Sequence, residues 1–527
     1  MLVKRAHFLR HRLSQMNNTE ALARRLGFWS ASIIVVANMI GSGIFGNTGY
    51  IQAQVGSPIM VMALWTLGGL IALAGALCYA ELSTTYPHAG GEYVYLKHIF
   101  GGLPSFLTGW ISLLVGFAAP AAAAALLSGV YMSDFLKVVY PDTILSRFLL
   151  DETNRKILAS ALIILFGIFH SFGVKQSGRV QNFLTGSKII VIILFAVGGL
   201  TLAHRNPGIP IHQAFSGAVK PEGLGVGLMF VMFAYSGWNA ASYLAEEIKQ
   251  PEKNLPRSLI AGTLFTIIIY LVMNYIYYLA VPATELAGKP DPAAQAANHL
   301  FGEKTNRIFH VAFSFMLLST LSACVMIGPR VYYAMSRDGL FFKFAGQLSH
   351  TGVPVRSIFV QCFISLLYIL LGTYEDIQTY MGFSLSLFPV LTVFGLILHR
   401  KRFPKFERAY KSPLFPFLPI MFILLSGLIV LTSYLDRPRE GNFALSVVLA
   451  GVPMYYLWMR LRAGNSTHLL ALITLQVLCV LAAGVAYHVL KYNPDALHMS
   501  LAALGVEVIS VAVFSYWLRR QYQSLAR

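Results

Sequence analysis

Long runs of apolar residues, separated by short polar or Pro/Gly-containing turns, repeat along almost the entire chain. Most runs approach the roughly 20 residues that a helix needs to cross a bilayer, and none alternates strictly as a membrane β-barrel strand does. A helix satisfies its own backbone polar groups in lipid, so the pattern predicts an all-α integral membrane protein. About fourteen candidate transmembrane helices lie at about 28–52, 58–83, 102–136, 157–172, 180–203, 223–247, 258–281, 305–336, 355–372, 377–398, 415–434, 442–460, 468–490 and 499–518.

The composition agrees with a membrane protein. Of the 527 residues, 56% are hydrophobic and 12% are charged, whereas roughly a quarter of the residues in soluble domains are charged. The net charge of +18 would suggest a nucleic-acid partner for a soluble protein. Here the basic residues concentrate in segments predicted to be cytoplasmic, most densely at 399–411 (HRKRFPKFERAYK), as the positive-inside rule expects. We therefore expect a multi-pass plasma-membrane protein with both termini in the cytoplasm, the lipid bilayer as its surroundings and no nucleic-acid partner.

Three regions are expected along the chain. Residues 1–27 form a basic cytoplasmic arm, because they lack the apolar stretch and cleavage site of a signal peptide. Residues 28–400 form a ten-helix core. Residues 401–527 add four accessory transmembrane helices and a short cytoplasmic tail. All four cysteines lie within apolar stretches, so we expect neither a disulfide framework nor a metal or other cofactor.

Two of the predicted helices are interrupted by small and polar residues near their midpoints. The first contains NMIGSGIFG at 38–46, with three glycines in six residues, and the sixth contains FAYSGWN at 233–239. A glycine inside a helix lowers the stability of the helix by about 1 kcal/mol relative to alanine, so these residues indicate a break. The alternative explanation for the small residues is that they allow close packing between helices. The two interruptions lie five helices apart, which is typical of transporters built from two inverted repeats with a binding site at the bilayer midplane. The repeats would span about 28–203 and 223–398.

An interrupted helix frees backbone amide and carbonyl groups that a ligand can satisfy. Helix N-termini favour a carboxylate and C-termini favour an ammonium group, and an α-amino acid carries both. The pattern therefore predicts a secondary transporter of amino acids. The sequence contains neither His-Glu-x-x-His nor Gly-x-Ser-x-Gly, the motifs a membrane-embedded enzyme would favour, so we expect no enzymatic activity. Electrical recording would distinguish a carrier from a channel.

Further motifs accompany the two interruptions. They are YAEL at 79–82, PHAGGEY at 87–93, PEKNLPR at 251–257 and SRDG at 336–339. Together with the interruptions, they resemble the amino acid, polyamine and organocation transporter superfamily over about residues 28–400, most closely its L-type amino acid transporter branch. The resemblance implies a LeuT-type fold of two inverted five-helix repeats, with helices one and six broken, that carries L-amino acids by alternating access.

The resemblance also implies the residues of the substrate site. Backbone amides around Ser42, Gly43 and Ile44 would hold the substrate carboxylate, and carbonyls of Met39, Phe233 and Ser236 its ammonium group. Side chains of Phe233, Tyr235 and Asn239 would line or gate the side-chain pocket, although ordinary packing is an equal alternative for each aromatic residue. The expected substrate-binding residues are Met39, Ile40, Gly41, Ser42, Gly43, Ile44, Phe233, Ala234, Tyr235, Ser236 and Asn239.

Lys188 is followed by the uncharged run 189–202, which places its ammonium group within a predicted membrane helix. A charged residue inside the bilayer costs about 2.5–3.5 kcal/mol on insertion scales and therefore suggests a function; the alternative is a side chain that reaches the interface. In the resembling family, sodium-independent members carry such a lysine where sodium-coupled relatives bind the ion. Lys188 would then tether the broken first helix and face Ser319 or Thr320. Amino acid exchange and proton-coupled symport both remain open.

Five charged residues at the predicted cytoplasmic edge are candidates for a gate that opens and closes. Ordinary ion pairing at the interface is the alternative. The candidates are Glu81, Glu246, Glu247, Arg330 and Arg337.

Two departures from the L-type branch affect the partner and the substrate. Eukaryotic members use a cysteine between helices three and four to join a heavy-chain glycoprotein, and residues 131–157 contain none, so no such disulfide-linked partner is expected. Fourteen helices are shared with the cationic amino acid branch, which keeps cationic amino acids or polyamines as the alternative substrates. Because residues 233–239 contain no acidic side chain, we predict a neutral L-amino acid. The sequence leaves the oligomeric state undetermined.

Overall fold

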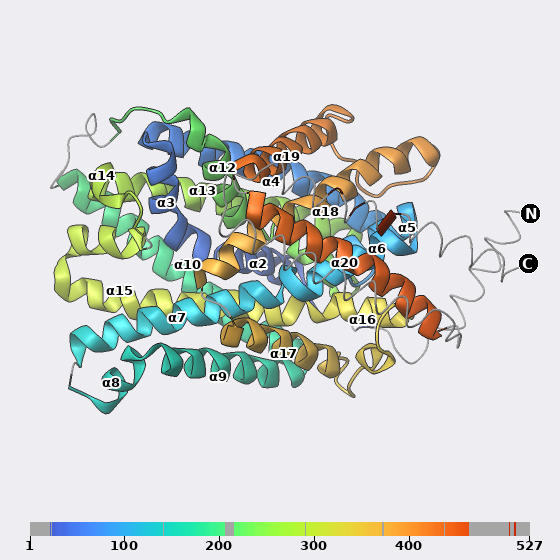
Figure 1. The fold of residues 1–527 in the computed structure, drawn as a ribbon, viewed down its shortest axis with the longest axis horizontal. Coiled ribbons are helices and arrows are strands. Elements are labelled where there is room, and N and C mark those ends of the chain that lie inside the picture. The colour runs from blue at the N-terminus through green and yellow to red at the C-terminus, as the bar shows by residue number, and fades with distance from the viewer. Residues whose placement is uncertain are drawn as a thin grey trace, which may run out of the picture.

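The computed structural model is a helical bundle (Figure 1). It describes residues 22, 24–140, 142–205, 215–289, 291–371, 374–436, 438–462, 505, 508, 511 and 512. The predicted helices at 468–490 and 499–518, and most of the predicted arm at 1–27, lie outside the described residues.

Every secondary-structure element assigned within the described ranges is a helix. The one extended pairing there is an isolated parallel bridge between Leu26 and Ile248. The prediction of an all-α protein is confirmed for this part of the chain. The elements are α2 (Phe28–Met39), α3 (Ser42–Val55), α4 (Pro58–Thr85), α5 (Glu92–Phe100), α6 (Gly102–Ile111), η1 (Ser112–Gly116), α7 (Ala118–Val139), α8 (Ile144–Leu150), α9 (Glu152–Ser171), α10 (Val174–Arg205), η2 (Pro221–Gly223), α12 (Leu224–Tyr235), η3 (Ala240–Glu247), α13 (Pro251–Ala280), α14 (Ala283–Leu286), α15 (Pro292–Ile327), α16 (Pro329–Arg337), η4 (Lys343–Gly346), α17 (Val355–Leu371), α18 (Tyr374–Arg402), α19 (Phe417–Asp436) and α20 (Pro438–Arg462).

Nine helical stretches within the described residues are long and apolar enough to cross a membrane. Two shorter apolar helices, Val355–Leu370 and Ala444–Met459, accompany them. The predicted multi-pass architecture is therefore confirmed, whereas the number of fourteen helices stays a prediction. The nine stretches are Phe28–Val55, Pro58–Thr85, Gly102–Lys137, Glu152–Ser171, Val174–Leu202, Pro221–Glu247, Pro251–Ala280, Ile308–Arg337 and Phe417–Leu435.

The long helices α7, α9 and α15 run side by side along the bundle, with α14 at one end and α5 and α16 at the other (Figure 1). The outer helices carry exposed apolar side chains, among them Ile164 and Leu165 on α9 and Ile190 and Leu194 on α10. Soluble monomers rarely expose large contiguous apolar surfaces. Lipid is the solvent that suits this surface.

Both predicted interruptions are present in the fold. The first transmembrane stretch breaks between α2 and α3 at Ile40 and Gly41, where the backbone leaves the helical region. The sixth breaks after α12, where Ser236 has a non-helical ψ of 148° and Gly237 has a φ of +96°. Only glycine adopts that conformation without strain, which explains the residue at this position.

Candidate functional site

The two broken helices touch each other at their breaks. A Cβ atom added to Gly43, at the start of α3, would lie 2.5 Å from the Cβ and 2.6 Å from the Cα of Ala234 near the end of α12. The hydroxyl of Tyr270 on α13 lies 2.6 Å from the Met39 carbonyl oxygen and 2.9 Å from that of Ala234, so it can donate to the last turn of either half-helix. Tyr270 was not predicted from the sequence, because nothing in its apolar surroundings distinguishes it from the other tyrosines of that helix.

Lys188 on α10 reaches the break in the first helix. Its side chain is buried, and its ammonium group donates to the carbonyl oxygens of Ala37 and Ile40 and to the Thr320 hydroxyl, which lies 2.9 Å away. The Thr320 hydroxyl in turn lies 3.0 Å from the Ile40 carbonyl oxygen. The side-chain nitrogen of Lys188 therefore contacts the carbonyl groups that the break exposes.

Of the two side chains expected to face Lys188, Thr320 is the one whose hydrogen bond to it is seen in the described residues. Ser319 instead lies 2.9 Å from the Thr185 hydroxyl, and its carbonyl accepts a hydrogen bond from Gln181. Ser319 thus belongs to the contact between α10 and α15 next to the lysine.

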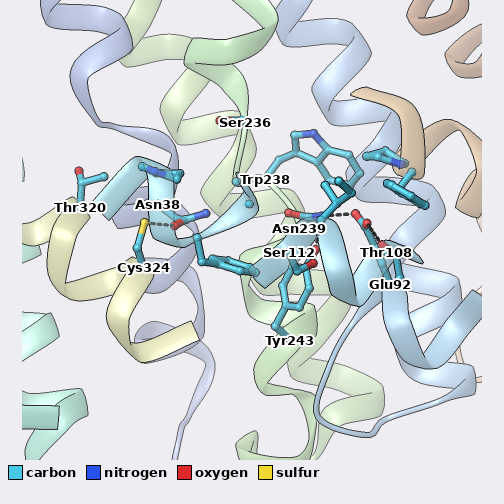
Figure 2. Close-up of a pocket in the computed structure, with 17 residues that line it drawn as sticks. Asn38, Glu92, Thr108, Ser112, Ser236, Trp238, Asn239, Tyr243, Thr320 and Cys324 are labelled. Carbon is cyan, nitrogen blue, oxygen red and sulfur yellow. Dashed lines mark hydrogen bonds between the residues drawn. The ribbon is translucent and has the colours of Figure 1, made fainter. Parts of the chain in front are cut away.

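A cavity opens beside the two breaks (Figure 2). Ser236, Asn239 and Thr320 are the predicted residues that line it, and Gly43, Phe233 and Tyr235 do not. Tyr235 packs against Trp65 and Tyr270, with ring centroids 5.7 and 4.9 Å away, which is the packing role weighed above. The lining consists of Asn38, Glu92, Thr108, Ile111, Ser112, Gly116, Phe117, Pro120, Ser236, Gly237, Trp238, Asn239, Tyr243, Thr320, Cys324, Phe388 and Pro389.

A buried carboxylate lies in the cavity wall, and the sequence did not predict it there. Glu92, at the start of α5, accepts hydrogen bonds from Asn239 at 2.7 Å and from Thr108 at 3.3 Å (Figure 2). It accepts a third from Tyr79 at 2.7 Å. Burial raises the pKa of Glu92, and these hydrogen bonds oppose the shift. The residue belongs to the PHAGGEY motif, and only the tertiary fold brings it to Asn239.

Four of the five candidate gate residues form two ion pairs with one another, and the fifth, Glu81, lies apart. Arg330 and Glu247 form a doubly hydrogen-bonded ion pair, with side chains 1% and 0% exposed and contacts of 2.8 and 3.2 Å. Arg337 pairs with Glu246 at 3.4 Å nearer the surface. Glu81 lies apart from them and pairs with arginines of another segment.

The comparison with family models decides the class of protein. The model for the amino acid permease family matches residues 26–459. The chain belongs to the amino acid permease family. This confirms the resemblance inferred from the motifs, and the protein is accordingly a multi-pass transporter of amino acids.

The alignments between this permease and its curated relatives extend over most of each relative's length. The serine/threonine exchanger SteT of Bacillus subtilis (strain 168) is 29% identical over 82% of this chain and 97% of its own. The human b(0,+)-type amino acid transporter 1 is 29% identical over 86% of this chain and 91% of its own. The human large neutral amino acids transporter small subunit 2 is 29% identical over 83% of this chain and 81% of its own. Transporters whose names give different substrates thus have the same sequence identity, 29%, to the permease.

Proposed function

We propose that this permease is a sodium-independent exchanger of neutral L-amino acids in the plasma membrane. The observation that carries the proposal is the ammonium group of Lys188, which donates to Ala37, Ile40 and Thr320 at the break in the first helix. A sodium ion bound to the same oxygen atoms would meet a positive charge at short range, and the mutual repulsion in a buried site is strong. The exchange mode is favoured because a relative, SteT, is named as an exchanger.

The substrate would bind between the two breaks. Backbone amides at the start of α3, around Ser42, Gly43 and Ile44, would hold its carboxylate, because a helix N-terminus attracts anions. Carbonyl groups at Met39, Phe233 and Ser236 would accept from its ammonium group. Ile40, Gly41 and the remaining predicted residues would shape the space around them.

Alternating access would follow from a LeuT-type arrangement of inverted repeats, about 28–203 and 223–398, within the core at 28–400. Helices one, two, six and seven would rock against the others, with both termini in the cytoplasm. The two paired arginines, Arg330 and Arg337, would close the cytoplasmic side. The absence of cysteine from 131–157 supports a transporter without a disulfide-linked heavy chain.

Uptake into proteoliposomes tests the proposal. Radiolabelled alanine, serine and leucine should accumulate only when the vesicles contain an unlabelled amino acid, and imposed sodium or proton gradients should change the initial rate by less than twofold. If a proton gradient drives accumulation into empty vesicles, the transporter is a proton symporter and not an exchanger. Stimulation that requires sodium would contradict the role of Lys188.

A cationic amino acid is the second candidate substrate, and Glu92 is the observation that favours it. Its carboxylate lines the cavity, and none of the ion pairs found in the described residues involves it. If arginine or a polyamine competes with serine uptake more tightly than alanine or leucine does, the cationic assignment is correct. Glu92→Gln should then abolish that preference and leave uptake of neutral amino acids in place.

The pH dependence of this competition provides a further check on the second candidate. Burial raises the pKa of Glu92 above the ordinary value of 4.5, so the folded protein binds this proton at a higher pH than an exposed carboxylate does. Lowering the pH should therefore neutralise Glu92 first and weaken arginine competition. Competition that does not change with pH would exclude Glu92 as the group that binds the cation.

A further inference from the structure

A groove lies between the ends of α5 and α18, and none of its lining residues lines the cavity beside the two breaks. Figure 1 shows α5 and α16 at the same end of the bundle. Its volume is about 380 Å³, within the roughly 300–1,000 Å³ of pockets that hold small molecules. The groove combines apolar side chains with cationic ones. Its lining is Ile99 and Phe100 at the end of α5, Leu398, His399, Lys401 and Arg402 at the end of α18, and Phe403 just after it.

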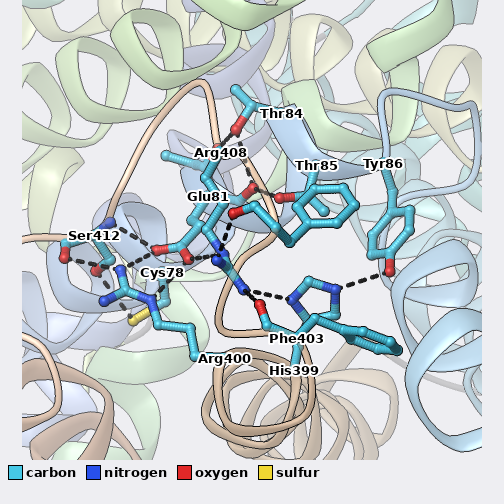
Figure 3. Close-up of polar contacts among 12 residues, drawn as sticks. Cys78, Glu81, Thr84, Thr85, Tyr86, His399, Arg400, Phe403, Arg408 and Ser412 are labelled. Carbon is cyan, nitrogen blue, oxygen red and sulfur yellow. Dashed lines mark hydrogen bonds and ion pairs between the residues drawn. The ribbon is translucent and has the colours of Figure 1, made fainter.

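The segment that forms one wall of the groove carries more positive charge than the structure neutralises. Next to the groove, Arg400 and Arg408 both pair with a single carboxylate, that of Glu81 (Figure 3). The Nε atoms of the two arginines lie 2.8 and 3.1 Å from the same Glu81 oxygen, and the side chains are only 19%, 5% and 1% exposed for Arg400, Arg408 and Glu81. Two guanidinium groups that share one carboxylate leave a net positive charge.

His399 connects this cluster to the groove. One ring nitrogen lies 3.2 Å from the guanidinium of Arg408, and the other lies 3.0 Å from the hydroxyl of Tyr86 (Figure 3). Lys401 and Arg402 lie two and three residues after His399 and are exposed. Within the described residues neither forms an ion pair, and Glu407, the acidic residue of the 399–411 segment, does not line the groove.

An anionic phospholipid fits this combination of side chains. A phosphate group accepts hydrogen bonds from arginine in a paired geometry and is attracted to lysine as a point charge. Ile99, Phe100 and Phe403 offer apolar surface that a soluble phosphate compound would leave unused and that an acyl chain would cover. The segment also exposes the aromatic rings of Phe403 and Phe406 beside its cations, as residues at a membrane interface do.

We propose that this groove binds one anionic phospholipid, with its phosphate between Lys401 and Arg402 and an acyl chain along Ile99, Phe100 and Phe403. The lipid would come from the leaflet that faces this end of the bundle, which is the cytoplasmic one in the proposed orientation. The site is distinct from the substrate cavity and does not depend on which amino acid is carried.

Native mass spectrometry of the full-length permease in detergent, titrated with dioleoylphosphatidylglycerol or dioleoylphosphatidylcholine, tests the site. We expect one tightly held phosphatidylglycerol molecule and at least fivefold weaker phosphatidylcholine binding. Lys401→Gln/Arg402→Gln should weaken phosphatidylglycerol binding by roughly 10- to 30-fold, because each basic residue at an anionic lipid surface contributes about a factor of five. Lys405→Gln/Lys411→Gln is the matched control, since it removes the same charge from the same segment outside the groove, and it should change binding by less than twofold.

Three outcomes would overturn the proposal. Equal losses in the two double variants would indicate attraction to the whole basic segment and not to the groove. Full affinity in Ile99→Trp, which fills the groove without changing its charge, would show that the lipid binds elsewhere. Displacement by millimolar inorganic phosphate would indicate a soluble anion as the ligand. Each variant is compared only if it elutes as a monodisperse peak, and no measurement depends on transport.

Discussion

The contact between Gly43 and Ala234 predicts a specific cost for a single added methyl group. In Gly43→Ala, the new Cβ would lie 2.5 Å from the Ala234 Cβ and 2.6 Å from its Cα, well inside the roughly 3.5–4.0 Å of an optimal carbon contact. One of these atoms is backbone, so no flexible side chain can move away. Overpacking of this kind costs about 1–3 kcal/mol, and the gain in helix propensity of about 1 kcal/mol offsets only part of it.

Gly427 on α19 provides the matched control for this substitution. An added Cβ there meets no atom within 4 Å, so Gly427→Ala should gain propensity without a clash and should be at least as stable as the wild type. The double variant Gly43→Ala/Ala234→Gly removes one of the two clashing atoms and should recover part of the loss.

Two measurements in parallel check the prediction. Thermal stability in detergent should decrease for Gly43→Ala and not for Gly427→Ala. Exchange in proteoliposomes should show a substrate affinity about tenfold weaker for Gly43→Ala, because displacing the two half-helices by even a fraction of an ångström disturbs the amides proposed to bind the carboxylate. If Gly43→Ala is as stable as the wild type and exchanges with normal affinity, the half-helices do not pack as described and the proposed site is wrong.

Three further variants test contacts around the broken helices. Tyr270→Phe removes the hydroxyl that bridges the carbonyls of both half-helices, and exchange assays should show a roughly tenfold loss of affinity; normal affinity would mean that the bridge is dispensable. Lys188→Met should lose most exchange while still being extracted as folded protein, and a rate above half that of the wild type would contradict the tether. Arg330→Met leaves Glu247 as an unpaired buried carboxylate at a cost of about 3–5 kcal/mol, so it should aggregate in size-exclusion chromatography. Arg330→Met/Glu247→Leu should restore a monodisperse peak, and failure to do so would assign the loss to contacts other than the ion pair.

Local sequence signals predicted the breaks because they are properties of the backbone. Glycine and serine in the middle of an apolar run weaken a helix wherever the run packs, so 38–46 and 233–239 were recognisable without knowledge of their neighbours. A lysine within an apolar run is expensive in any membrane protein, which made Lys188 recognisable in the same way. In these cases the free-energy cost of placing the residue in a membrane helix depends only on the bilayer and on that helix.

Partnerships between distant segments were not predictable in this way. Residues 233–239 contain no acidic side chain, and the fold brings Glu92 to the cavity wall from a helix far away in the sequence. Glu81 was grouped with the other gate candidates, yet it pairs with Arg400 and Arg408. A single sequence places many charged residues of each sign at the same predicted depth in the membrane. Hydropathy does not indicate which of them form ion pairs.

The sequence by itself predicted the helical fold that the described part of this membrane transporter adopts, and its two interrupted helices, because bilayer thickness and backbone hydrogen bonding restrict what an apolar run can be. Only the tertiary structure decided which oxygens surround the Lys188 ammonium, that Thr320 and not Ser319 is its partner, and that Tyr270 joins the two breaks. Those contacts depend on the rotation and depth of each helix in the bundle. Rotation and depth are set by the packing of many side chains at once, which no local pattern contains.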